Sequence, residues 1–266
     1  MRFGCCLNMV AMQPDGTGIE NIEKLAGLGY DYAELPLAEM MVLPERERQG
    51  IILCLKRSKI KCEVCNNFFP GTIRLTGNDT DPEAIMEYAE NALSFASSLG
   101  VEYVVFGSGK AKNVPENFPI ADGYRQVVGL LKNIGPVAKE KNITIVIEPL
   151  RKAECNLINT FEEGCRLADD VGHSNVKVLV DYYHFCVEQE PIENLLLKGK
   201  KYLRHVHFSN PNGRVFPSFA DENGYGEFIE ALKKIGYSQR VSCEAYSQDF
   251  AKDAEKAIRF FKESFA

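Results

Sequence analysis

Polar residues end four short apolar segments in the second half of the chain. The four residues are Glu148, Asp181, His207 and Glu244, and they are separated by 33, 26 and 37 positions. Each interval is about the length of one strand, one helix and their connections. We therefore expect each residue at the end of a different strand of a repeating β/α fold, where the strand ends would bring the four side chains together.

Eight apolar segments alternate with helical patterns along the chain. The expected strands are Phe3–Asn8, Tyr32–Pro36, Lys61–Phe68, Tyr103–Gly107, Ile143–Glu148, Val176–Asp181, His205–Ser209 and Val241–Ala245. Between them, Pro82–Leu99 and Tyr124–Glu140 repeat apolar residues at helical spacings of three and four. Eight such units in 266 residues predict an α/β chain folded as a single (β/α)8 barrel over residues 1–266. An open doubly wound sheet is the alternative, but it would need a Gly-rich loop after the first strand, where Asn8-Met9-Val10-Ala11 stands.

Composition excludes several classes of function. A net charge of −6 argues against a nucleic-acid backbone as partner, because phosphate binding needs clustered Lys and Arg. No apolar segment approaches a membrane span, and the N-terminus does not resemble a signal peptide. Nine cysteines cannot all pair within one chain, so we expect reduced thiols and a cytoplasmic protein. Cys62 and Cys65 are three residues apart in an expected strand, which predicts that they face opposite sides.

Three carboxylates and one imidazole at one place would repel each other unless a divalent cation joined them. An oxygen-rich set with one nitrogen suits Mn²⁺, Mg²⁺ or Co²⁺ better than a Cys-rich zinc site. Taken singly, each acid is more often an ion-pair partner, and a histidine on an apolar strand is more often a buried core residue. The occurrence of all four on successive strands favours a shared metal site.

The segment Gly107-Ser108-Gly109-Lys110 lacks the spacing of a phosphate-binding P-loop. We interpret it as a loop at the mouth of the barrel, with small residues that leave room for a substrate. Lys110 and Lys112 are expected to be solvated surface residues, with an anionic substrate group as the alternative partner.

Four segments carry a family resemblance over nearly the whole chain. They are Ile147-Glu148-Pro149-Leu150, Asp181-Tyr182-Tyr183-His184, His205-Val206-His207 and Cys243-Glu244. In order and spacing they resemble the xylose isomerase-like TIM barrels and, within that superfamily, the sugar isomerase/epimerase group that includes the tagatose and psicose 3-epimerases. The same pattern occurs in inosose and dehydroshikimate dehydratases, so it indicates the superfamily better than the substrate.

The resemblance implies a role for each matching residue. Glu148, Asp181, His207 and Glu244 would hold one divalent metal ion, with Mn²⁺ preferred and Mg²⁺ or Co²⁺ as alternatives. The expected substrate-binding residues are Glu154, His184 and Arg214. Arg214 follows His207 at a slightly longer spacing than in those epimerases, and the Asn210–Gly213 turn would absorb the difference. A small-molecule sugar would be the partner, and the outer helices would form a homodimer or homotetramer.

The expected reaction is C3 epimerisation of a free ketose through a cis-enediolate, with Glu148 and Glu244 as the opposed catalytic acid and base. The alternative is a metal-dependent dehydratase or lyase that acts on a cyclic polyol or carbocyclic acid with the same ligands. A barrel that binds a polyol without turnover would need neither the metal nor two carboxylates. A DNA-repair endonuclease of the same fold would need more than the four histidines of this chain and a basic face.

Overall fold

The computed structural model describes residues 1–219 and 224–265, and its strands form a closed parallel barrel in the order β1 to β8. The strands are β1 Arg2–Cys6, β2 Tyr32–Pro36, β3 Lys61–Asn66, β4 Tyr103–Phe106, β5 Thr144–Ile147, β6 Val176–Asp181, β7 Leu203–Phe208 and β8 Arg240–Cys243. All eight expected strands are present, with their ends shifted by at most two residues. The predicted (β/α)8 barrel is therefore confirmed, and the open sheet is excluded.

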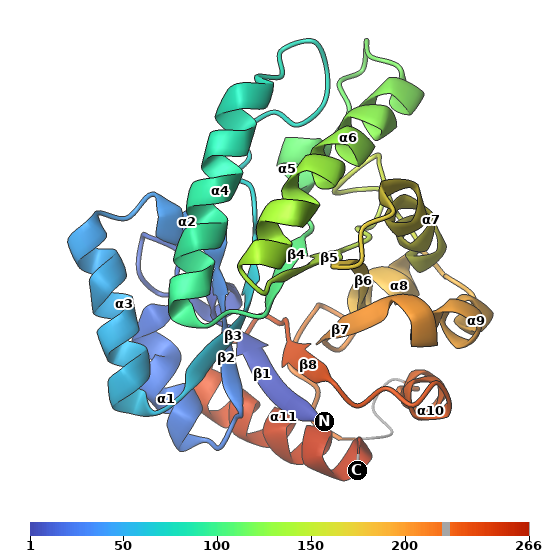
Figure 1. Cartoon of the computed structure of the whole chain (residues 1–266). Coiled ribbons are helices and arrows are strands. Elements are labelled where there is room, and N and C mark those ends of the chain that lie inside the picture. Colours follow the sequence, from blue (N-terminus) through green and yellow to red (C-terminus); the bar gives the residue numbers. More distant parts are fainter. Residues whose placement is uncertain (220–223, 266) are drawn as a thin grey trace.

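Helices surround the barrel and connect successive strands (Figure 1). They are α1 Ile22–Gly27, α2 Leu37–Met41, α3 Glu45–Ser58, α4 Pro82–Leu99, α5 Gly109–Lys112, α6 Ile120–Glu140, α7 Phe161–Val171, α8 Tyr182–Val187, α9 Ile192–Tyr202, α10 Gly226–Lys234 and α11 Phe250–Ser264. Two short 3-10 helices, η1 Leu7–Val10 and η2 Ile19–Asn21, follow β1. Thr160 caps α7, since its hydroxyl accepts a hydrogen bond from the Glu163 amide at 3.2 Å.

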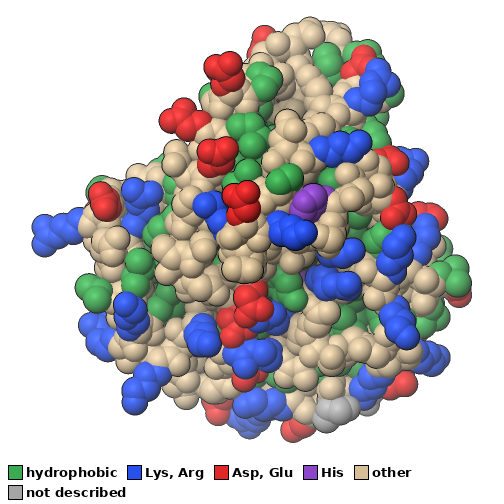
Figure 2. Space-filling model, in the orientation of Figure 1, with side chains coloured by type: hydrophobic (Ala, Val, Ile, Leu, Met, Phe, Trp, Pro, Cys, Tyr) green, Lys and Arg blue, Asp and Glu red, His purple; other side chains and the backbone are tan. Residues whose placement is uncertain are grey.

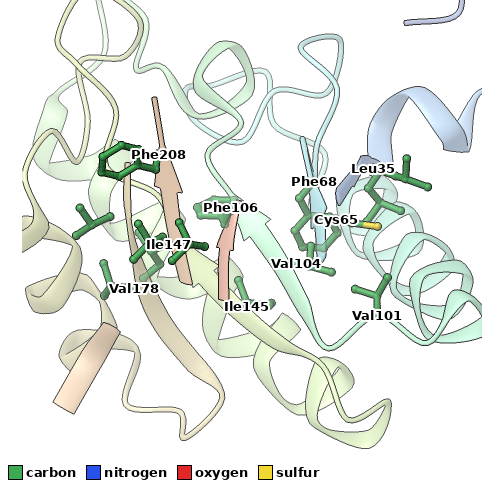
Figure 3. Close-up of a cluster of buried hydrophobic side chains, with 14 of the residues drawn as sticks. Leu35, Cys65, Phe68, Val101, Val104, Phe106, Ile145, Ile147, Val178 and Phe208 are labelled. Carbon is green, nitrogen blue, oxygen red and sulfur yellow. The ribbon is translucent and has the colours of Figure 1, made fainter. Parts of the chain in front are cut away.

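Two hydrophobic clusters fill the fold on either side of the strands. The outer cluster lies between strands and helices, and Figure 3 shows part of it, including Val104, Phe106, Ile145 and Ile147. A small inner cluster lies within the barrel and consists of Tyr32, Val64, Val105, Val146 and Leu179. Because side chains alternate along a strand, residues two positions beyond the inner cluster point into the mouth at the C-terminal ends of the strands.

A bulge in β3 corrects the expectation for the two cysteines. Ala33 of β2 pairs with Cys62, whereas the next residue, Glu34, pairs with Val64, so that Glu63 is an extra residue. The bulge reverses the alternation, and Cys62 and Cys65 both lie in the outer cluster with their sulfur atoms 3.9 Å apart. The prediction that they face opposite sides was wrong, although both thiols are free and buried.

Charged side chains of both signs occur on the face of the molecule shown in Figure 2. Among the described residues, no helix is long and apolar enough to cross a membrane.

Candidate metal centre

The four residues that end the apolar segments converge at the mouth of the barrel. Glu148 follows β5, Asp181 ends β6, His207 lies near the end of β7, and Glu244 follows β8. Each offers one ligand atom, and these four atoms all lie within 4.8 Å of one another. Nδ1 of His207 is 3.1 Å from Oε1 of Glu148 and 3.0 Å from Oε2 of Glu244. All four residues are buried.

The charge of this cluster fits a divalent cation. The site holds three buried carboxylates but only one guanidinium beside them, that of Arg214. Its Nη2 lies 2.9 Å from Asp181 and 2.6 Å from Glu244. Burial raises the pKa of Asp181 well above its usual range, and the neighbouring carboxylates add to the effect of burial. Burial also opposes ionisation of Glu244, but the charges of Arg214 and His207 outweigh it and lower the pKa of Glu244. Carboxylate oxygens with one imidazole nitrogen are a suitable ligand set for Mn²⁺ or Mg²⁺.

Glu34 orients the imidazole of His207 from inside the barrel. Its carboxylate is fully buried and lies 2.8 Å from Nε2 of His207 and 2.9 Å from Nε2 of His205. It also accepts a hydrogen bond from the Ser242 hydroxyl at 2.6 Å. A carboxylate at Nε2 places the ring proton there, which leaves the Nδ1 lone pair directed at the ligand cluster. Glu34 was not predicted from the sequence, although an acid within the apolar segment Tyr32–Pro36 is the same signal that identified Glu148.

The three expected substrate-binding residues adjoin the ligand cluster. His184 Nε2 is 3.5 Å from Asp181 and 3.9 Å from Glu154. Arg214 donates hydrogen bonds to the carboxylates of Asp181 and Glu244. Nδ1 of His184 accepts the backbone N–H of Arg151 at 3.3 Å, whereas Nε2 has no hydrogen-bond partner among residues 1–219 and 224–265. Burial, reinforced by the charge of Arg214, lowers the pKa of His184 to about 4. His184 is therefore neutral at neutral pH, with a free donor at the edge of the site.

Arg151 links these residues and was not singled out from the sequence. Its Nε donates to Glu154 at 2.7 Å, and its Nη1 donates to the Tyr183 hydroxyl at 2.7 Å. The guanidinium groups of Arg151 and Arg214 lie 5.3 Å and 5.0 Å from the centre of the Tyr183 ring. Tyr183 thus supports both arginines through cation–π contacts.

The loop after β4 packs against Glu148, and this changes two expectations. A Cβ at Gly107 would lie 2.2 Å from Oε2 of Glu148, so the absent side chain makes room for that carboxylate. Lys112 is fully buried, and its Nζ donates to the backbone oxygen of Glu148 at 3.1 Å. The prediction of a solvated Lys112 was wrong, because α5 turns its last residue under the β5 end; Lys110 is exposed as expected.

Comparison with known protein families identifies the fold family. The description "Xylose isomerase-like TIM barrel" belongs to a family model that matches residues 22–264. The chain belongs to this family. The predicted membership of the xylose isomerase-like barrels is confirmed, and the four converging residues lie within the matched segment.

Curated relatives of the chain are epimerases and isomerases. D-psicose 3-epimerase of Ruminiclostridium cellulolyticum is 31% identical over 238 residues, which cover 85% of this chain and 77% of that protein. Inosose isomerase of Halalkalibacterium halodurans is 25% identical over 284 residues, which cover 97% of this chain and 94% of that protein. At the level of the family, the prediction of an isomerase is confirmed.

Solved structures share the fold of the chain. A crystal structure of D-psicose 3-epimerase in the presence of D-fructose superposes with a TM-score of 0.87 at 22% identity, covering 100% of this chain and 99% of that one. The IOLI protein with a bound zinc atom superposes with a TM-score of 0.71 at 22% identity, covering 99% of this chain and 96% of that one. Both structures have the barrel found here.

Proposed function

We propose that the protein is a divalent-metal-dependent sugar epimerase or isomerase that epimerises a free ketose at C3. The observation that carries the proposal is the pair of buried carboxylates that lie against the same nitrogen of one imidazole. Glu148 and Glu244 come from β5 and β8 and lie 3.1 Å and 3.0 Å from Nδ1 of His207. Two carboxylates held this close to a common point suit the removal of a proton from one face of a carbon and its return to the other.

The ion would be held by Glu148, Asp181, His207 and Glu244, with Mn²⁺ preferred and Mg²⁺ or Co²⁺ as alternatives. When bound, it would supply Lewis-acid polarisation of the substrate carbonyl. Their burial and mutual proximity support the choice of these four residues.

Glu148 and Glu244 form the proposed catalytic pair. One carboxylate accepts the proton of the C3–H bond, and the electron pair of that bond forms a C2–C3 double bond while the carbonyl oxygen gains negative charge. The product is a cis-enediolate. The other residue of the pair begins the cycle as a carboxylic acid and gives its own proton to the opposite face of C3, so that the carbonyl at C2 is restored. Proton exchange with solvent then returns the two carboxyl groups to their starting states.

His184, Arg214 and Glu154 would bind the substrate oxygens next to the reacting carbons. Nε2 of His184 and Nε of Arg214 are both buried at the cluster and have no hydrogen-bond partner among the described residues, which supports this role. A buried donor without a partner is costly, and a substrate oxygen would satisfy it. Glu154 would accept from a hydroxyl while Arg151 holds its carboxylate.

The alternative is a metal-dependent dehydratase or lyase that acts on a cyclic polyol or carbocyclic acid. A relative named inosose isomerase matches 97% of the chain, and this likeness favours a cyclic polyol as the substrate class in this alternative. Such an enzyme needs a group that protonates a departing hydroxyl, and its substrate loses water.

Solvent deuterium incorporation tests the proposal. The protein with Mn²⁺ would be incubated in D₂O with fructose, psicose, tagatose and sorbose, and then again with EDTA. We expect deuterium at C3 of at least one ketose, and none with EDTA. Glu244→Gln should abolish exchange but retain some metal binding, whereas Glu255→Gln on exposed α11 should not change exchange. Exchange that persists in Glu244→Gln would refute the assignment, and loss of water from an inosose would favour the alternative.

We further propose that residues 1–266 act as one domain on a small-molecule sugar in the cytoplasm, as a homodimer or homotetramer. The net charge of −6 supports a partner other than nucleic acid. Sedimentation of the purified protein measures the oligomeric state.

A further inference from the structure

A buried amide lies at the end of β3 with one polar atom unpartnered. Asn66 is 2% exposed, and its Nδ2 donates to Oδ1 of Asn8 at 2.9 Å. Its Oδ1 has no hydrogen-bond partner among residues 1–219 and 224–265. Turning the amide by 180° would still leave one of its two polar atoms without a partner. A buried polar group of this kind lowers stability unless something outside the chain satisfies it.

The alternation of β3 directs this amide into the mouth of the barrel. Val64 belongs to the inner cluster and Cys65 to the outer one, so Asn66 points inward, one layer above Val64. Asn66 pairs with Pro36 of β2 and reaches over it to Asn8, which follows β1. In a ring of eight strands, β3 lies opposite β7, the strand that carries His207. The two asparagines therefore line the side of the mouth that faces the metal ligands.

We propose that Asn66 and Asn8 form a hydroxyl-binding subsite for the end of the substrate that is remote from the reacting carbonyl. The inference rests on the proposed function and adds a substrate class to it. A ketose held at its carbonyl end by residues of β5 to β8 extends its other end toward β1 and β3. There the Asn66 amide oxygen accepts a hydrogen bond from a hydroxyl, and the Asn8 amide can donate one in return.

The subsite selects for a hydroxyl at the remote end. The amides carry no net charge, so they suit a neutral hydroxyl rather than a phosphate. A substrate that lacks the hydroxyl leaves the buried amide unpaired, and a site built around a hydrogen bond discriminates strongly against such an analogue. We expect a ketohexose to be preferred over its 6-deoxy counterpart by about tenfold, a factor within the range expected when one buried polar group is left unpaired.

The test compares psicose and 6-deoxypsicose as substrates for C3 exchange with Mn²⁺. The wild type should show the tenfold higher kcat/KM for psicose, mainly through a lower KM. Asn66→Leu and the milder Asn66→Ser should bring the ratio close to one by impairing psicose alone. Asn175 is the matched control, because its Oδ1 also has no partner in the described part of the chain, but its Nδ2 bonds the backbone oxygens of Gly135 and Ile143, away from the mouth of the barrel. Asn175→Leu should change stability and leave the ratio intact.

The outcomes separate the subsite from the proposed function. A wild-type ratio near one, or an unchanged ratio in both Asn66 variants, overturns the subsite even if exchange occurs. If the wild type exchanges deuterium into neither sugar, the proposed function fails for these two ketoses. The subsite is then tested by the rise in unfolding temperature that each sugar causes. Stabilisation by psicose above that by 6-deoxypsicose, lost in Asn66→Ser, supports the subsite. Equal or absent stabilisation overturns it.

Discussion

Nε2 of His207 lies 2.8 Å from Oε1 of Glu34, on the side of the imidazole ring opposite the Nδ1 atom that faces Glu148 and Glu244. One ring nitrogen is thus committed to a buried carboxylate, and the other is left for the ligand cluster. Although Glu34 is fully buried, His207 and His205 lower its pKa, so the carboxylate remains ionised. An ionised partner at Nε2 makes Nδ1 a better ligand.

Replacement of Glu34 by glutamine should weaken metal binding. Glutamine keeps the size of the side chain, but its amide group cannot accept hydrogen bonds from His205, His207 and Ser242 as the carboxylate does. Loss of such a partner of a ligating histidine typically lowers metal affinity by about 10- to 100-fold. Calorimetric titration of the metal-free protein with Mn²⁺ measures the change.

Glu63 provides the control for Glu34. It is also a buried glutamate, 4% exposed, but it bonds Arg240 at 2.6 Å at the N-terminal end of the barrel. Glu63→Gln should lower stability and leave Mn²⁺ affinity unchanged. If both variants bind Mn²⁺ as tightly as the wild type, Glu34 has no effect on the metal centre.

Gly107→Ala should displace Glu148. The new Cβ would lie 2.2 Å from Oε2 of Glu148, a distance that side-chain atoms do not tolerate, so the carboxylate must move. We expect loss of Mn²⁺ affinity and of C3 exchange, with a stability cost of about 1–3 kcal/mol from overpacking. Titration with Mn²⁺ and urea unfolding measure the two effects.

Gly129→Ala is the matched control for Gly107→Ala. Gly129 lies within α6, and a Cβ there meets no atom within 4 Å. This variant should retain metal binding and gain about 0.5–1 kcal/mol of stability, since alanine favours the helix. If Gly107→Ala exchanges deuterium at C3 as fast as the wild type, the position that Glu148 occupies here is not required for the reaction.

The buried His184 should make the metal-free protein less stable in mild acid. Its pKa is about 4 in the folded state and near 6.5 when unfolded, because burial disfavours the charged ring. Above pH 6.5 both states are neutral at this site, and the stability is fully present. As the pH falls from 6.5 to 4, only the unfolded chain gains the proton, so stability falls by up to about 3 kcal/mol.

Urea unfolding in EDTA at pH 7 and pH 4 measures this dependence. His184→Gln removes the titrating group, so the loss of stability between the two pH values should be smaller in the variant than in the wild type. Equal losses in the two proteins would show that His184 is not held neutral by its surroundings.

Much of the fold could be predicted because each strand carries its signal locally. The apolar segments locate β5 to β8, and Glu148, Asp181, His207 and Glu244 then converge by the geometry of a parallel barrel. The positions of Asn66 and Gly107 depend instead on neighbours that are distant in sequence.

Other features could not be predicted from one strand alone. The bulge at Glu63 is a property of the pairing between β2 and β3, so the shared side of Cys62 and Cys65 is visible only in the assembled sheet. Lys112 lies on a four-residue helix with no periodicity to reveal its burial. Glu34 stands in an apolar segment as Glu148 does, but its contacts with His205 and Ser242, more than 170 residues away in the chain, are visible only in the folded barrel.

Anomalous diffraction from crystals grown with Mn²⁺ tests the central claim most directly. We predict one strong manganese peak per chain, bounded by Glu148, Asp181, Glu244 and Nδ1 of His207. A second group of potential ligands, Cys6, Glu34 and Nε2 of His207, lies deeper in the barrel. A manganese peak at that deeper group would contradict the proposed metal site. So would the absence of a peak among the three carboxylates and the imidazole at the mouth of the barrel.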